Sequence, residues 1–124
     1  MNRESFEALV DKALESLPPE LAERLDNVAV FVEDYPSKHQ RSTSGIGRDA
    51  TLLGLYEGVP LTERGNDYGM VVPDKITIFQ KPIESMCRTD SEVVEMVRST
   101  VLHEIAHHFG ISDERLDELE GETE

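Results

Sequence analysis

The sequence predicts an α+β protein, with helices towards both ends of the chain and short strands between them. Apolar residues recur at helical spacing between Phe6 and Leu17, and again over a longer stretch after Thr89. Three stretches between these are apolar or alternate in polarity and favour β-structure: residues 28–32, 51–56 and 75–81. No domain boundary, repeat or low-complexity tract interrupts the pattern, so residues 1–124 are expected to form a single domain.

The N-terminal third is expected to hold two helices and a strand. The first helix is amphipathic, and Pro18 and Pro19 end it because proline lacks an N–H and clashes inside a helix. Pro19 is also suited to begin a short second helix that reaches Leu25. Residues 28–32 are continuously apolar, which predicts a strand covered on both faces.

The middle of the chain is predicted to contain a loop and two further strands. Serine, glycine and cations replace the apolar pattern over residues 36–50, which indicates a surface loop. Three cations there are interpreted as solvated rather than as substrate contacts: Lys38, Arg41 and Arg48. Residues 51–56 form the next strand. The alternation in Lys75–Lys81 predicts a half-buried strand that Pro82 closes.

Charge and composition exclude several classes of partner. A formal net charge of −14 argues against nucleic acid and against anionic membrane surfaces, which both bind cationic proteins. No apolar run approaches the roughly 20 residues that span a bilayer, and the charged N-terminus is unlike a secretory signal. Cys87 is the one cysteine, so an internal disulfide is impossible. A cytoplasmic location is therefore expected.

A long amphipathic helix is predicted near the C-terminus. Thr89 has the N-cap position of a capping box, with Glu92 three residues later. Gly110 is suited to end the helix, because glycine adopts positive φ without strain. The apolar residues between these ends form one broad arc: Val94, Val97, Val101, Leu102, Ile105, Ala106 and Phe109. This arc is expected to pack into the core.

The opposite side of this helix carries the residues that can bind a metal. His103 and His107 are four residues apart and fall opposite the middle of the apolar arc, with Glu104 beside them. Two imidazoles at this spacing can hold one zinc ion, and a neighbouring carboxylate can move protons. The motif therefore predicts a zinc site in which Glu104 acts as the base.

A catalytic zinc site needs a third protein ligand, and the sequence offers several. Asp113 is preferred, because the reversal at Gly110 can bring it back towards the metal; its other role is the N-cap of a final short helix. Glu114 is the reserve ligand and His108 a weaker one. Tyr56 and Tyr68 are candidates for a phenol that stabilises the transition state, although a packing role is preferred for each.

HEIAHHFGISD, residues 103–113, resembles the extended signature H-E-x-x-H-x-x-G-x-x-[HD] of metzincin-type metallopeptidases. The chain as a whole is similar to the minimal single-domain bacterial zincin-like metallopeptidases. That resemblance implies a compact zincin-like domain, with a small mixed β-sheet packed on a long active-site helix and with N-terminal helices. It implies zinc held by His103, His107 and Asp113, with Glu104 as the catalytic base.

The resemblance also implies a function and a mode of substrate binding. The expected activity is hydrolysis of peptide bonds by a zinc-activated water, in a peptide or protein bound along Lys75–Lys81 as an edge strand. The aspartate in third position and the lack of a methionine after Met96 depart from the common metzincin pattern. The alternative is therefore a catalytically weak or inactive zincin-like module that binds peptides or regulates a partner.

Overall fold

The computed structural model describes residues 1–26, 28–44, 51–58, 74–112, 114–115 and 118. Its elements in chain order are α1 (Arg3–Glu15), α2 (Pro19–Ala22), the 3-10 helix η1 (Glu23–Leu25), β1 (Val28–Glu33), α3 (Lys38–Ser44), β2 (Gly54–Glu57), β3 (Asp74–Phe79), α5 (Gln80–Met86) and α6 (Asp90–Phe109). Helices and a three-stranded sheet together give the α+β class that the sequence predicts.

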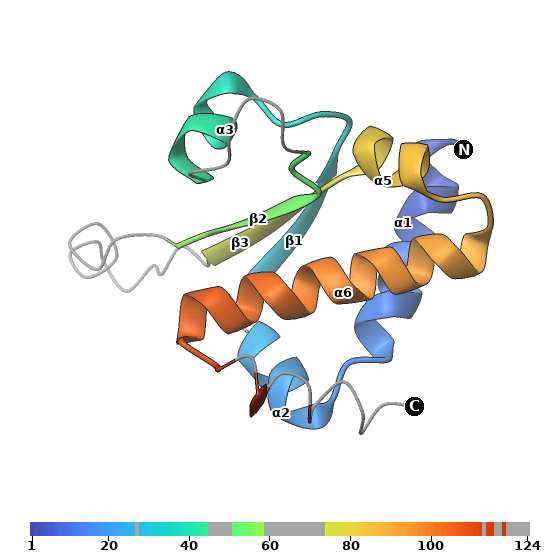
Figure 1. Ribbon diagram of the computed structural model, residues 1–124. Helices are drawn as coiled ribbons and strands as arrows, with labels where there is room; N and C mark the ends of the chain where they lie inside the picture. Colours follow the sequence, from blue (N-terminus) through green and yellow to red (C-terminus); the bar gives the residue numbers. More distant parts are fainter. Residues whose placement is uncertain (27, 45–50, 59–73, 113, 116–117, 119–124) are drawn as a thin grey trace, which may run out of the picture.

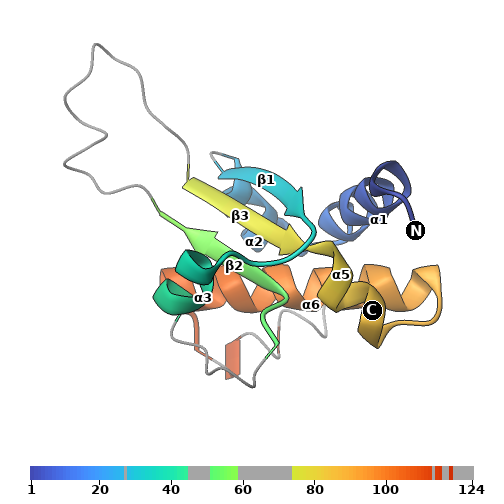
Figure 2. The ribbon, with the colours of Figure 1, turned by 90° about the horizontal axis from the view of Figure 1, so that it is seen from above.

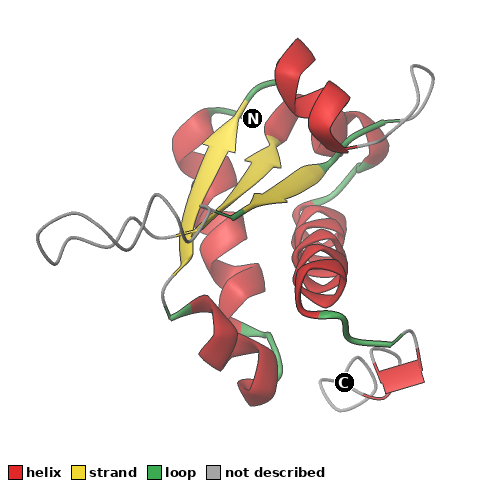
Figure 3. Cartoon of the chain, turned by 90° about the vertical axis from the view of Figure 1, so that its left-hand side faces the viewer, coloured by secondary structure: helices red, strands yellow, loops and turns green. Residues whose placement is uncertain are grey.

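The sheet is mixed and small, with the strand order β1-β3-β2. β1 runs parallel to β3, whereas β2 runs antiparallel to it. The long helix α6 crosses beneath the sheet, and α3 lies on the other side (Figure 1). Figure 2 shows β3 between β1 and β2, and Figure 3 shows α6 nearly end-on beside the strands. The sheet packed on a long helix matches the fold that the family resemblance implies.

The core lies between the sheet and the helices α1 and α6. Ile76 and Ile78 point from β3 towards the helices and are fully buried. They pack with residues from α1 and α6 that share apolar character and complete burial, among them Phe6, Val97, Val101, Leu102 and Ile105. This packing holds α6 firmly, so the opposite face of the helix is presented in a fixed orientation.

The N-terminal helices form where predicted, although the second is α-helical only to Ala22 and continues to Leu25 as the 3-10 helix η1. α1 begins after Asn2, whose side chain accepts a hydrogen bond from the backbone N–H of Ser5. It ends two residues before Leu17, ahead of the two prolines, and Pro19 opens α2. Within the described ranges, none of the helices is both long and apolar enough to cross a membrane.

The helix α6 also confirms its predicted ends. Thr89 and Glu92 make both bonds of the capping box, since the Thr89 side chain accepts from the Glu92 N–H and the Glu92 side chain accepts from the Thr89 N–H. Gly110 terminates the helix in the left-handed region, with φ of 68°. Sequence-local signals therefore fix the helix that carries the histidines.

The prediction that Lys75–Lys81 forms an edge strand is wrong in two respects: its place in the sheet and its bounds. β3 covers Asp74–Phe79 and is the central strand, hydrogen-bonded to β1 on one side and to β2 on the other. Thr77 and Phe79 are buried as completely as the isoleucines on the other face, so the strand is not half-buried. With both edges of β3 paired inside the sheet, no peptide can add to it.

Two helices were missed because their starts resemble other structures in the sequence. α5 follows β3 directly, and Pro82 lies in its first turn, where proline is tolerated, instead of closing the strand. α3 occupies part of the stretch expected to be a loop. Its start is a second reciprocal cap: the Ser37 hydroxyl accepts from the Gln40 N–H, and the Gln40 side chain accepts from the Ser37 N–H.

The remaining strands also differ from expectation. β1 is only partly covered, and the side chain of Phe31 is 51% exposed beneath the ammonium of Lys75. β2 starts at Gly54, three residues after the predicted start at Thr51. Residues 59–73, between β2 and β3, lie outside the described residues, as does Arg48.

Gly54 allows β2 to approach α6 closely. A Cβ atom at this position would lie 2.7 Å from Cγ2 of Thr100 and 3.2 Å from the carbonyl oxygen of Thr77. The Thr100 rotamer is fixed, because its hydroxyl donates to the carbonyl oxygen of Met96 at 2.7 Å. Only glycine therefore fits between the strand and the helix without displacing one of them.

Replacing Gly54 by alanine is expected to lower the free energy of unfolding by about 1–3 kcal/mol, the usual cost of overpacking. The measurement is urea denaturation followed by circular dichroism. Thr100→Ser removes Cγ2 but keeps the hydroxyl, so the double variant should recover part of the loss. If Gly54→Ala is as stable as the wild type, the close contact between β2 and α6 is refuted.

Candidate metal centre

The imidazole of His103 is oriented by its own helix. Nδ1 lies 2.7 Å from the backbone carbonyl oxygen of Ser99, one turn earlier on α6. A carbonyl oxygen can only accept, so Nδ1 carries a proton, and in the neutral ring the free lone pair is therefore on Nε2. The ring is exposed, and Nε2 is therefore available to a ligand from solvent. This is the arrangement in which outer-shell partners prepare metal-binding histidines.

His107 lies one turn after His103 on the same exposed side of α6. Ile105 and Ala106, which lie between the two histidines in the sequence, are buried in the core. The two imidazoles are thus held on one face of a helix whose other face is packed. The burial of the helix agrees with the placement of the histidine pair opposite the apolar arc, except that Phe109 at the end of the arc is 39% exposed.

Glu104 is half-buried and is held by the adjacent strand. The backbone N–H of Tyr56 on β2 donates to Oε1 of Glu104 at 2.8 Å. Burial raises the pKa of the Glu104 carboxyl, while the Tyr56 hydrogen bond and the positive charges of His107 and His103, when present, act in the opposite direction. One oxygen is therefore fixed, and the carboxylate is a stronger base than an exposed glutamate.

The candidates for the third ligand that follow Gly110 lie near the C-terminal end of the described residues. Asp113, the preferred candidate, lies outside them. Glu114 is described and exposed. Over the part of the chain that the structure describes, no three His, Cys, Asp or Glu residues converge on one point. The described donors are two imidazoles one helical turn apart in the sequence, and imidazole is a ligand type that zinc accepts.

His108 belongs to a cluster with Tyr56 and Asp74. Its ring stacks on Tyr56 with a centroid distance of 3.9 Å, and its Nε2 lies 3.8 Å from Oδ2 of Asp74. The Tyr56 hydroxyl donates to the same carboxylate at 2.7 Å. His108, the weaker candidate for the third ligand, therefore packs on Tyr56 and lies beside Asp74. The phenol of Tyr56 is directed to Asp74.

Replacing Tyr56 by phenylalanine is expected to lower the free energy of unfolding by about 0.5–1.5 kcal/mol, the value of one hydrogen bond. The backbone N–H that holds Glu104 is unchanged, so any peptide hydrolysis should stay within about threefold of wild type. The measurements are thermal denaturation and cleavage rate. A loss of turnover as large as that of a Glu104 variant would instead assign the phenol to the reaction.

Several other ionisable or phenolic side chains belong to other elements or lie outside the described residues. Lys38, His39 and Arg41 belong to α3, on the other side of the sheet (Figure 1). Tyr68 lies outside the described residues. Cys87 is a partly buried thiol at the end of α5, and burial, followed by the charge of Glu92, raises its pKa.

Two partners of the site were missed by sequence reasoning. Ser99 was detectable in principle, because a helical histidine often donates to the carbonyl four residues earlier and the spacing is visible in the sequence. The Tyr56 amide was not, because it is 48 residues from Glu104 and the contact depends on the pairing of β2. Long-range strand pairing has no local sequence signal.

Comparisons with known proteins identify a family and a similar fold. The family described as zincin-like metallopeptidases matches residues 25–123. The fold is similar to that of a conserved hypothetical protein from Thermo thermophilus, with a TM-score of 0.55 and 24% identity over 88% of this chain and 94% of that chain. Among curated proteins, none matches the sequence.

Proposed function

Because the chain belongs to the zincin-like metallopeptidase family, we propose that it is a zinc-dependent peptidase that uses His103 and His107 as ligands and Glu104 as general base. Asp113 completes the ligand set in this proposal, as the family signature implies. The observation that carries the proposal is that hydrogen bonds hold two of these three helix residues in place. One imidazole is oriented by a carbonyl, and the carboxylate is fixed by a strand N–H.

The chemistry assigned to the chain is proton transfer and orientation. Bound zinc would supply Lewis acidity, which acidifies a water and polarises the scissile carbonyl. Glu104 takes a proton from the attacking water while the water oxygen bonds to the carbonyl carbon. The same proton then passes to the leaving amine as the C–N bond breaks. No covalent link to the protein forms, so no nucleophilic side chain is required.

The peptide is proposed to lie along β2 rather than along the central strand β3. β2 flanks α6, and its Tyr56 N–H points away from β3 and towards Glu104. Within the described sheet, β2 has a neighbouring strand on one side. A peptide running beside β2 passes the histidine pair and the carboxylate together, which an occupant of the far edge at β1 would not.

The test combines metal content with activity. Purified protein would be analysed for zinc by mass spectrometry and incubated with a peptide library, beside the Glu104→Gln variant. Stoichiometric zinc and cleavage that depends on Glu104 are the expected results. Zinc and peptide binding without Glu104-dependent cleavage would reject catalysis, and would favour the alternative of a peptide-binding or regulatory module.

A further inference from the structure

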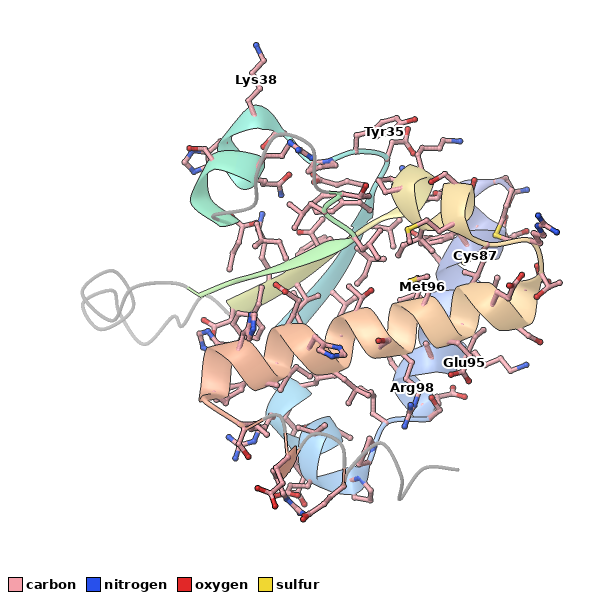
Figure 4. The ribbon with its side chains drawn as sticks, in the orientation of Figure 1. Tyr35, Lys38, Cys87, Glu95, Met96 and Arg98 are labelled. Carbon is pink, nitrogen blue, oxygen red and sulfur yellow. The ribbon has the colours of Figure 1, made fainter. Side chains whose placement is uncertain are left out.

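An open recess of about 470 Å³ lies between the end of α5 and the first half of α6. It is lined mainly by Met86, Cys87, Glu92, Glu95, Met96 and Ser99. Figure 4 labels Cys87 near the end of α5, and Glu95 and Met96 on the first half of α6. This α5–α6 recess lies outside the histidine pair and is not used in the proposed reaction.

The recess lies on the same helix face as the candidate metal centre. Met96, Ser99 and His103 are spaced by three and four residues, so they form one stripe along α6. The carbonyl of Ser99 accepts from the ring of His103, and Ser99 is also one of the residues that line the recess. Met96 is seven residues from His103, about 10 Å at 1.5 Å per residue. An extended peptide covers that distance in about three residues.

The lining has an apolar body and a negative rim. Two methionines and a thiol supply adaptable apolar surface. The charged residues that line the recess are Glu92 and Glu95. The carboxylate of Glu92 already accepts hydrogen bonds from the backbone N–H groups of Arg88 and Thr89. Glu95 is exposed, and it makes no hydrogen bond or ion pair to any other residue that the structure describes. Its carboxylate is therefore available to an incoming cation.

We propose that the α5–α6 recess binds a lysine or arginine side chain of the peptide substrate, two to four residues from the bond that is cleaved. The apolar stem packs on Met86 and Met96, and the cationic end pairs with Glu95. This inference rests on the proposed peptidase function and adds a substrate class to it. The formal net charge of −14 favours the approach of basic peptides in the same way.

Binding can be measured without turnover. Fluorescein-labelled eight-residue alanine peptides would carry one lysine at a scanned position, and their affinity for the zinc-loaded Glu104→Gln protein would be read by fluorescence anisotropy. Norleucine replaces lysine in a matched set, because it keeps the stem and removes the charge. Lysine is expected to bind tighter at one position by about two- to fivefold, the range of an exposed ion pair. That difference should shrink in about 0.5 M salt.

Three variants separate the parts of the recess. Glu95→Gln should abolish the advantage of lysine and leave norleucine unchanged. Met86→Ala, at a methionine that is 54% exposed, should weaken both peptides by about two- to threefold. Glu7→Gln on α1 removes an equal charge beside a different groove and should change neither. Equal binding of lysine and norleucine, or equal effects of the two glutamate variants, overturns the proposal.

Cys87 provides an independent readout, because it is the one thiol in the chain. The lysine peptide should slow its modification by N-ethylmaleimide, and unchanged modification contradicts the proposal. The peptidase function and the binding of a basic side chain in the recess can also be refuted separately. Lysine-dependent binding without cleavage by the wild type rejects the peptidase and keeps the recess. Cleavage with no basic preference at any position two to four residues away keeps the peptidase and rejects the recess.

Discussion

Replacing Glu104 by glutamine is expected to slow peptide hydrolysis by a factor of about 10² to 10⁴, the contribution of a positioned general base. Glutamine keeps the size of the side chain, and its carbonyl oxygen still accepts from the backbone N–H of Tyr56. It cannot take a proton from water. The measurement is the initial rate of cleavage of one peptide by zinc-loaded protein, with substrate well below saturation.

The stability of the same variant serves as the control for its folding. Burial raises the pKa of Glu104, which means that the metal-free fold disfavours the charged form. A group with a raised pKa adds stability below its unfolded pKa, and that stability is lost as the pH rises through the folded value. Metal-free Glu104→Gln should therefore be at least as stable as the wild type at about pH 7, and this advantage should vanish as the pH falls towards about 4. A large loss of stability would make the rate comparison uninformative about the base and refute this interpretation of the contact.

Replacing either His103 or His107 by alanine is expected to weaken zinc binding by more than about 100-fold. Outer-shell partners of a metal cost about 10- to 100-fold when they are lost, and a ligand contributes more than its partners. Competition with a chromogenic chelator measures the affinity directly. His39→Ala, an exposed histidine on α3, is the matched control and should bind zinc as the wild type does.

The third ligand can be identified by the same titration. Asp113→Ala should reproduce the loss caused by the histidine variants, while Glu114→Ala should stay within about threefold of the wild type. The opposite order would move the ligand to Glu114. Wild-type affinity in both variants would contradict the ligand set implied by the family signature, and would point to a two-histidine site.

The parts of the fold that sequence predicts well are those encoded by near neighbours. The α6 ends are an example, because the capping box at Thr89 and Glu92 and the positive φ of Gly110 are properties of a few adjacent residues. The start of α3 was encoded in the same way by Ser37 and Gln40, and was overlooked because the surrounding composition suggested a loop. Glutamine at the third position makes the same reciprocal bond as glutamate in a capping box.

The parts that sequence predicted poorly depend on contacts between distant residues. The alternation of Lys75–Lys81 indicates a strand but contains no information on whether neighbours pair on one edge or both. That depends on β1 and β2, which lie far away in the sequence. The candidate site divides along the same line. The placement of His103 and His107 on one face follows from helix periodicity, whereas the hydrogen bond from β2 to Glu104 does not.

The hydrogen bond from Tyr56 to Glu104 makes a backbone amide into a spectroscopic probe of the proposed base. An amide proton that donates to a carboxylate changes its NMR chemical shift as that carboxylate gains or loses a proton or approaches a cation. A single ¹H–¹⁵N cross-peak would thus follow protonation, zinc loading and peptide arrival at Glu104 without a label near the histidines. Its hydrogen-exchange rate would also report how often strand β2 separates from helix α6, and hence how often the carboxylate is released from its fixed orientation.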